Sequence, residues 1–439
     1  EQAPDIFVHL YVNPTTWAKE NAICYARFKA KDLITRGADG NPFASIEPEW
    51  VVLKEDPSMG KVENAFPGSI LMKLAFGPSG FANSPEADWD ADVKMATSAQ
   101  MSVPHILRVN LYQARNIPAC DPDGSCDPQI TVHVGGANSQ KLPKMMDTTD
   151  PIWYRSLDFD VNMPSDRRLW PMVSMSIFDW DRFGSNDYVG AAHVDTSSVA
   201  HGFVPSEKDL PDPAWYPLFY GEPGDSQGEV LCSIQCVAAS DANAVAFRQR
   251  SKSSIKPKMR KAWVEISALG LRNLKAPGML NLHAPTVEFD LGTDQHSKVL
   301  PKTKPSSKPT SQSPNFCEIL TIETEMPVNP LFAPRLNLRV VDQQFGGFIR
   351  KVVGVAAIDL KKKIPPFPLN NPEYPNPWYE PPQSAGFGDT RRVADAEPID
   401  PSTMVGMHGD TDSKVQDRNI EAKVPYIIGP DGAAIDPKT

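Results

Sequence analysis

The sequence predicts an all-β chain that contains two antiparallel β-sandwiches, and three observations lead to this fold class. Proline supplies 44 of the 439 residues, about twice its ordinary share, and proline breaks both helix interiors and central strands. Short strand patterns separated by Pro, Gly and Asp turns run from Ile106 to about Val237, a spacing typical of a sandwich or barrel. A second series of the same kind runs from Lys261 to about Leu360.

The two strand series share an opening motif and a later one. VNLYQARNIPA (109–119) and VEISALGLRNLKA (264–276) each combine a strand with an R-N-hydrophobe corner. Each series also has a later strand that ends in aspartate, SIFDWD (176–181) and LRVVDQ (338–343). A pair of homologous domains is the simplest account of this repetition.

Composition divides the chain into five parts. Short alternating strands fall within 5–36, a polar stretch rich in Pro and Gly covers 37–68, and the strand SILMKLAF follows. The insertion PKTKPSSKPTSQSP in the second series is predicted to be a flexible basic loop. The predicted parts are a β-rich segment with a linker at 1–95, a first sandwich at 100–247, a basic linker at 248–261, a second sandwich at 262–365 and an irregular Pro-, Gly- and Asp-rich linker or tail at 366–439.

Several classes of protein are disfavoured by motif and composition. No apolar run approaches the roughly 20 residues that span a bilayer, and the opening EQAPDIFVHL lacks the parts of a signal peptide. The six cysteines show no zinc-type pairing, so reduced thiols of a cytosolic protein are expected. No G-x-S-x-G, H-E-x-x-H, P-loop or G-x-G-x-x-G motif occurs, so neither an enzyme nor a small-molecule substrate is expected.

Charge is unevenly distributed between the two sandwiches. Residues 101–247 carry 19 acidic and 9 basic residues, whereas 248–375 carry 10 acidic and 20 basic residues. Such a division is explained either by docking of the two parts on each other, or by a cation site in the first part and an anionic partner for the second. Nucleic acid is not expected as that partner, because no groove-reading or aromatic-interleaved motif accompanies the charge.

Aspartates gather in two loops of the first sandwich. CDPDGSCDP supplies Asp121, Asp123 and Asp127, and FDWDRFGSND supplies Asp179, Asp181 and Asp187. Aspartate often only caps turns, but the spacing of these two loops fits one ion pocket. Oxygen ligands without His or Cys select a hard cation, with Ca²⁺ favoured over Mg²⁺ by the crowding of carboxylates. An EF-hand is excluded, because the loop places Cys126 and Val132 where that motif needs Gly and Glu.

On these motifs, residues 106–237 resemble a C2 domain, the eight-stranded antiparallel sandwich of synaptotagmins and protein kinase C. The matching segments are L-Y-Q-A-R-N-I-P, D-P-D-G-S-C-D-P, D-P-I-W, F-D-W-D-R-F-G-S-N-D-Y-V-G, W-Y-P-L and G-E-V-L. The resemblance implies that five acidic residues bind Ca²⁺: Asp121, Asp127, Asp179, Asp181 and Asp187. It also implies that Pro122, Trp180, Arg182 and Phe183 lie at loop tips that contact the membrane. The sequence departs from the family pattern at Gly184, where a serine ligand is common, and at Gln129, where an aromatic is usual.

The chain as a whole resembles the ferlins. The opening P-D-I-F-V…C-Y-A-R-F-K-A-K-D-L is similar to their FerB segment, and A-L-G-L-R-N-L-K, S-P-N-F and A-P-R-L-N-L-R-V-V-D to the C2 domain that comes next in ferlin order. Ferlins are tail-anchored proteins of vesicle fusion and exocytosis. The resemblance therefore implies Ca²⁺-dependent binding of anionic phospholipid at a vesicle or plasma membrane, on the cytoplasmic side, with vesicle-fusion proteins as further partners. The rival interpretation is a Ca²⁺-independent scaffold whose C2 domains bind other protein chains.

The second sandwich departs from the calcium pattern. Its first loop, LKAPGMLNLHAP, has no acidic residue, and its third loop keeps only Asp342. We therefore expect no Ca²⁺ site there. Its basic residues, above all those at the start of the domain, are candidates for anionic lipid, with a solvated linker or docking on the acidic first domain as the alternative. These candidates are Lys252, Lys256, Lys258, Arg260 and Lys261.

Overall fold

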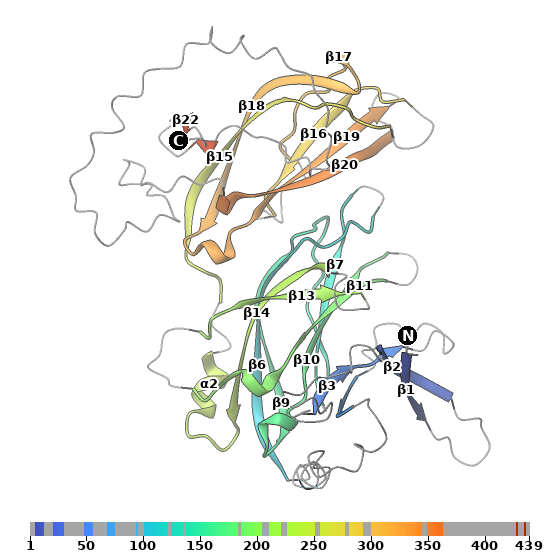
Figure 1. The fold of residues 1–439 in the computed structure, drawn as a ribbon. Coiled ribbons are helices and arrows are strands. Elements are labelled where there is room, and N and C mark those ends of the chain that lie inside the picture. The colour runs from blue at the N-terminus through green and yellow to red at the C-terminus, as the bar shows by residue number, and fades with distance from the viewer. Residues whose placement is uncertain are drawn as a thin grey trace, which may run out of the picture. The chain divides into compact units, whose positions relative to one another are not determined.

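The fold is described from a computed structural model of the 439-residue chain (Figure 1). The chain divides into two compact units, Glu1–Lys256 and Pro257–Thr439, and each is described by itself. The structure describes residues 5–12, 21–29, 48–55, 68–74, 94, 101–121, 124–135, 137–182, 186–203, 210–220, 226–250, 255–276, 281–292, 300–344, 349–362, 427–428 and 434–435. Among these residues, no helix has the length and apolar character needed to cross a bilayer.

Within the first 74 residues, the described strands form two small antiparallel sheets. These strands are β1 (Asp5–Val12), β2 (Asn21–Lys29), β3 (Glu49–Val52), β4 (Lys54–Glu55) and β5 (Ser69–Met72), with β1-β2-β4 in one sheet and β3-β5 in the other. Alternation in β2 buries Cys24 and Ala26, which pack with Leu53. The predicted strands within 5–36 and at SILM are confirmed, whereas β3 and β4 fall inside the stretch that was predicted to be only polar and Pro/Gly-rich.

The first sandwich has eight main-path strands and one short addition. They are β6 (Ser102–Arg115), β7 (Pro128–Val134), β8 (Gln140–Lys141), β9 (Ile152–Pro164), β10 (Val173–Asp179), β11 (Asp187–Val194), β13 (Ala214–Phe219) and β14 (Ser226–Ala238), with β12 (Ala200–His201) beside β14. Their order in the sheet is β8-β7-β10-β11-β13-β14-β6-β9. Inward-facing apolar residues such as Val109, Leu111 and Met175 fill one core. Short 3₁₀ turns, η5 (Arg167–Leu169) and η6 (Thr196–Ser198), join strands.

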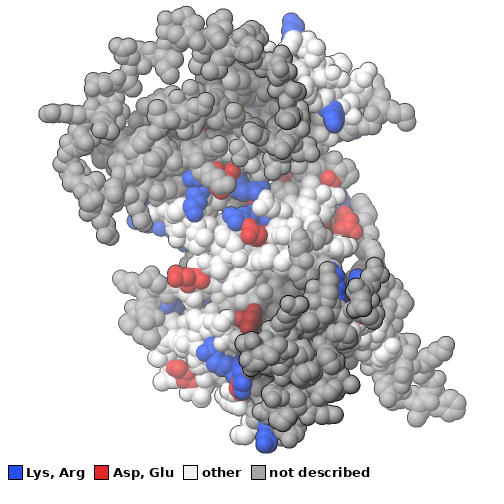
Figure 2. All heavy atoms as spheres, in the orientation of Figure 1, with Lys and Arg blue, Asp and Glu red and all other residues white. Residues whose placement is uncertain are grey.

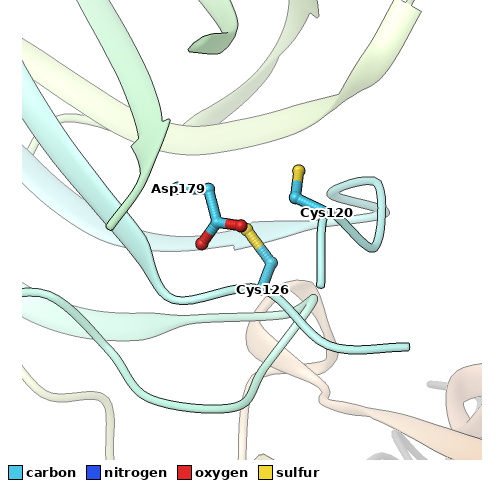
Figure 3. A group of neighbouring side chains, drawn as sticks. All are labelled: Cys120, Cys126 and Asp179. Atoms are coloured by element: carbon cyan, nitrogen blue, oxygen red, sulfur yellow. The ribbon is translucent and has the colours of Figure 1, made fainter. Parts of the chain in front are cut away.

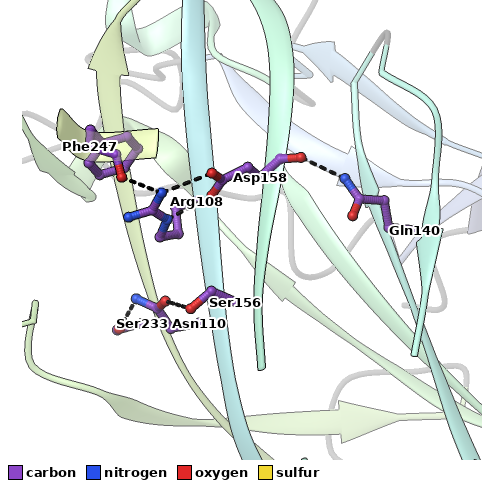
Figure 4. A network of polar contacts seen from close by, with 7 residues as sticks. All are labelled: Arg108, Asn110, Gln140, Ser156, Asp158, Ser233 and Phe247. Atoms are coloured by element: carbon purple, nitrogen blue, oxygen red, sulfur yellow. Dashed lines mark hydrogen bonds and ion pairs between the residues drawn. The ribbon is translucent and has the colours of Figure 1, made fainter. Parts of the chain in front are cut away.

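A buried arginine ties the end of this unit to its sheet (Figure 4). Arg108 on β6 is 2% exposed, and its guanidinium donates to both carboxylate oxygens of Asp158 on β9, at 2.7 and 2.8 Å. It also donates to the carbonyl of Phe247 at 2.7 Å and lies over that ring. Phe247 belongs to α2 (Ala244–Arg250), so the network anchors the helix that precedes the second unit.

The second unit repeats five main strands of the sandwich and adds the short strand β17. Its strands are β15 (Met259–Gly270), β16 (Pro285–Asp290), β17 (Pro309–Thr310), β18 (Ser313–Pro327), β19 (Arg335–Gln344) and β20 (Ile349–Asp359), with 3₁₀ turns η7 (Pro330–Phe332) and η9 (Leu360–Lys362). The sheet orders β15-β18-β17 and β16-β19-β20 match the pairing of β6 with β9 and the order β7-β10-β11. The core contains Val264, Ile266, Phe289 and Leu338. The fold class predicted from the sequence, all-β and of C2 type, is thus confirmed in the described strands.

The predicted basic linker 248–261 overlaps two elements at its ends, since α2 ends at Arg250 and β15 begins at Met259, and the boundary between the two units falls inside it. The expectation about the insertion in the second series is wrong. The insertion predicted to be a flexible loop instead lies along the edge of β16. There Lys302 forms a bridge with Glu288, and the buried Thr303 exchanges hydrogen bonds with Val287. Farther along the insertion, β17 pairs with β18 in the other sheet. Edge-strand hydrogen bonding thus overrides the polar composition of this insertion.

Most of the predicted tail lies outside the described residues. Within 366–439 the structure describes only β21 (Ile427–Ile428) and β22 (Ala434–Ile435), which pair with each other.

Candidate functional site

The candidate site lies where β7, β10 and β11 meet. In the register of these strands, Asp179 at the end of β10 faces Pro128 on one side and Asp187 on the other. A bulge between Ile177 and Phe178 sets this pairing. The two carboxylates predicted from separate ends of one loop, Asp179 and Asp187, therefore stand on directly opposed residues. Like charges in that position repel each other unless a cation lies between them.

Backbone amides hold the two innermost carboxylates. Asp179 is 2% exposed and accepts the amide N–H of Asp127 at 2.6 Å. Asp127 is 8% exposed and accepts the amide N–H of Asp147 at 2.9 Å. Within the described residues, neither carboxylate forms an ion pair with a lysine or arginine. A buried charge without a partner is costly, and a bound cation would compensate it.

The electrostatics of Asp179 reflect this crowding. Burial raises the pKa of the Asp179 carboxyl above its ordinary value, and the charges of Asp181 and Asp127 act in the same direction. The amide of Asp127 and the thiol of Cys126 oppose the shift by hydrogen bonding. A bound hard divalent cation would lower the pKa of Asp179 instead, since it stabilises the ionised form of a carboxylate.

The remaining predicted ligands are distributed around this pair. Asp121 is half-buried in the first loop, where Gly124 donates its amide to the Asp121 carbonyl at 3.0 Å. Asp181 is half-buried, and its amide donates to the side chain of Asn186 at 3.2 Å. Asp187 is exposed at the start of β11. The structure thus brings Asp127, Asp179 and Asp187 together through the strand register, and Asn186 shapes the third loop without having been predicted.

The predicted membrane-contact residues are only partly described. Arg182 is exposed, and Pro122 and Phe183 lie outside the described residues. Trp180 is half-buried, its amide donates to the carbonyl of Asp127 at 3.1 Å, and the ammonium of Lys144 lies over its ring. The sequence did not predict the contact of Lys144 with Trp180. Lys144 lies in the loop before β9, far from Trp180 in the chain, so no local pattern connects the two residues.

The equivalent position in the second sandwich differs in its residues and its hydrogen bonds. Pro285 pairs with Asp342 as Pro128 pairs with Asp179, so Ala284 stands in the place of Asp127 and Gln344 in that of Asp181. Asp342 is fully buried, and four donor contacts reach it. They come from the amides of His283 (3.0 and 3.1 Å) and Ala284 (2.8 Å) and from the Gln344 side chain (2.9 Å). These N–H groups stabilise the buried Asp342 carboxylate.

A matched pair of measurements tests this difference. In the full chain, Asp342→Asn is expected to leave Ca²⁺ binding unchanged and to destabilise the second unit by about 1–3 kcal/mol, because an amide group would face N–H donors. Calorimetric Ca²⁺ titration and thermal denaturation measure the two effects. Weakened Ca²⁺ binding in this variant would show that the second unit holds an ion after all.

The predicted lipid-binding lysines and arginine do not share one face. Lys256 and Lys258 are exposed, Arg260 is half-buried, and Lys261 on β15 lies opposite Glu325 on β18. Alternate residues of a strand face opposite sides, so Arg260 and Lys261 point apart. Lys252 lies outside the described residues.

Comparison with known proteins places this site in a family context. The family model described as C2 domain matches residues 105–218 and 264–380. Mouse myoferlin is 28% identical over 273 residues, which cover 58% of this chain and 12% of that protein. Mouse Fer-1-like protein 4 is 23% identical over 389 residues, which cover 78% of this chain and 18% of that protein. The chain therefore spans less than a fifth of the length of either relative.

A solved structure of the two tandem C2 domains of extended synaptotagmin 2 also matches. It is 17% identical, with a TM-score of 0.26, and the match covers 60% of this chain and 81% of that one.

Proposed function

Because the chain belongs to the C2-domain family and has ferlins as its relatives, we propose that its first sandwich binds Ca²⁺ and, through it, anionic phospholipid. The observation that carries the proposal is the pair of buried carboxylates, Asp127 and Asp179, held by backbone amides and without an ion pair in the described part of the chain. An all-oxygen donor set of this density suits calcium.

The side chains of the pocket have distinct roles in this proposal. Asp127 and Asp179 provide the fixed inner ligands, because each is oriented by a backbone N–H. Asp121, Asp181 and Asp187 close the pocket from three different positions along the chain. When bound, calcium would cancel the repulsion between the acidic loops and lipid phosphate and would accept phosphate oxygens in its coordination shell. Arg182, which is exposed beside the pocket, would add attraction to the same headgroups.

For the whole protein we propose a role in vesicle–membrane fusion and regulated exocytosis, at the cytoplasmic side of a vesicle or plasma membrane. The support is the relationship to ferlins, and vesicle-fusion proteins are the partners it suggests. The second candidate is a Ca²⁺-independent interaction scaffold. It is favoured by the second sandwich, where Ala284 and Gln344 replace two ligands and N–H groups saturate Asp342.

Co-sedimentation of the full chain with phosphatidylserine-containing vesicles tests the proposal. We expect binding in Ca²⁺ that persists toward about 0.3 M salt, because direct coordination is weakly screened. A weaker component in chelator should be lost by that salt concentration, since the Debye length is only about 10 Å even at 0.1 M. Equal binding in Ca²⁺ and chelator would favour the scaffold interpretation.

Two charge-matched variants separate the contribution of the basic residues. Exchange of Lys252, Lys256, Lys258 and Lys261 for Gln should remove most of the component seen in chelator and spare the Ca²⁺ component. Exchange of Lys302, Lys304, Lys308 and Lys361 for Gln, which removes the same amount of charge from within the second unit, is the control. On the face drawn in Figure 2, Lys and Arg side chains lie among Asp and Glu side chains. Equal effects of the two variants would therefore mean that the lipid is attracted by the overall positive charge and not by a defined basic site.

A further inference from the structure

Two thiols lie beside the proposed calcium pocket. Cys120 and Cys126 flank the first acidic loop, and Asp179 reaches them from the end of β10 (Figure 3). One ligand atom from each of the three side chains lies within 4.8 Å of the other two. Cys120 is exposed, whereas Cys126 and Asp179 are buried. The group was not expected from the sequence, where the cysteines showed no metal-type spacing.

Backbone hydrogen bonds hold the thiols in this arrangement. The amide of Cys120 donates to the Ser125 carbonyl at 3.0 Å, which brings the two ends of the loop together. The carbonyl of Cys126 accepts the amide of Thr148 at 2.8 Å. The Cys126 sulfur lies within 4.8 Å of a carboxylate oxygen of Asp179 and of the Cys120 sulfur. The loop geometry therefore holds the backbone of both cysteines, and the exposed Cys120 side chain has room to turn toward an ion.

The dimensions suit a tetrahedral ion that prefers sulfur. Bonds of about 2.3 Å to sulfur and about 2.1 Å to oxygen place tetrahedral ligand atoms roughly 3.5–3.8 Å apart. Ligand atoms already within 4.8 Å need to close by about 1 Å at most. Two thiolates and one carboxylate form a soft donor set, which selects Zn²⁺ and similar ions over Ca²⁺. A tetrahedral ion would take its fourth ligand from a source other than these three side chains, and solvent can supply it because Cys120 is exposed.

We propose that Cys120, Cys126 and Asp179 form a binding site for a thiophilic divalent cation, Zn²⁺ being the biological candidate. Binding replaces the two thiol protons, which pass to solvent, and gives a complex of Zn²⁺ with two thiolates and one carboxylate. Because Asp179 is also an inner ligand of the calcium pocket, occupation by Zn²⁺ should weaken Ca²⁺ binding. That competition rests on the proposed function, whereas the thiol site itself does not.

Cobalt titration of the fully reduced full chain, under argon, tests the site. Co²⁺ is the probe, because thiolate ligands give it a charge-transfer band in the near ultraviolet. We expect the band to saturate at one equivalent and to disappear when Zn²⁺ is added. Cys120→Ser should weaken Co²⁺ binding at least about tenfold, and as a change at an exposed side chain it should not unfold the domain. Cys317→Ser, at the other exposed cysteine, is the matched control and should leave the titration unchanged.

The possible results separate the site from the calcium competition. Absence of a thiolate band, or a band that Cys120→Ser leaves intact, would overturn the site. If the band depends on Cys120, excess Ca²⁺ should shift its midpoint to higher Co²⁺ concentration, and this would support shared use of Asp179. A Cys120-dependent band that ignores both Ca²⁺ and Asp179→Asn would overturn the sharing and the role of Asp179. Circular dichroism of each variant checks that the fold is intact.

Discussion

Replacement of both Asp179 and Asp181 by asparagine is expected to abolish Ca²⁺-dependent vesicle binding by the full chain. Two of five carboxylate ligands are lost, and a unit charge near 4 Å contributes several kcal/mol even at an effective dielectric constant of about 20. We therefore expect the Ca²⁺ concentration needed for half-maximal vesicle binding to rise at least about 100-fold. Co-sedimentation over a Ca²⁺ series measures this shift.

The same double variant should be more stable than the parent when no Ca²⁺ is present. Burial raises the pKa of Asp179, so the folded state binds the proton more tightly than the unfolded state. Stability from this group is therefore greatest at low pH and is lost as the pH rises through the raised pKa. Asparagine keeps the acceptor for the Asp127 amide and removes the charge, for an expected gain of about 1 kcal/mol at neutral pH.

A control variant distinguishes loss of ligands from loss of charge. Asp212→Asn with Glu323→Gln removes two exposed acidic charges that are not among the predicted ligands and should leave the Ca²⁺ dependence unchanged. Ca²⁺-dependent binding that survives in the Asp179/Asp181 variant would show that the pocket is assigned to the wrong residues.

Arg108→Met is expected to destabilise the first unit by about 3–5 kcal/mol, since it leaves a largely buried carboxylate without its partner. The change removes both hydrogen bonds to Asp158, the bond to the Phe247 carbonyl and the contact with that ring. Denaturant-induced unfolding gives the stability, and hydrogen exchange of α2 and β9 reports which part opens first. We expect α2 to lose protection before the strands do.

Arg115→Met is the matched control for this experiment. Arg115 lies on the same strand and forms an ion pair with Glu229, but both side chains are about one-third exposed. A pair of this kind contributes at most about 1 kcal/mol. The double variant Arg108→Met with Asp158→Leu should recover much of the loss, because an apolar pair removes the stranded charge. A loss below about 1 kcal/mol in Arg108→Met itself would contradict the anchoring role.

Local patterns determined the strands and the positions of the acidic residues. Segments such as ILRVNLYQA and LRVVDQ alternate between apolar and polar residues, and this pattern involves only neighbours in the chain. A strand with one buried face requires such alternation, so it can be predicted from the sequence. The two Asp-rich loops were predictable for the same reason, since each is a short contiguous motif. The absence of paired carboxylates in the second sandwich could also be read directly.

Features that depend on strand register or on distant contacts could not be read in this way. The insertion at 301–314 is polar, but the edge of β16 supplies hydrogen-bond partners that order part of it. In the sequence, Arg108 looks like any polar residue of a strand. It is buried and holds α2 in place only because the fold brings Asp158 and Phe247 next to it.

The sequence by itself therefore determined which residues carry charge and which segments form strands, because both are local properties of the chain. Only the tertiary structure decided what each charge meets. It opposed Asp179 to Asp187 across β10 and β11, brought Cys126 against Asp179, and surrounded Asp342 with N–H donors. The physical reason is that burial and pairing arise between residues far apart in the chain, and a shift of one residue in register would change every one of these contacts.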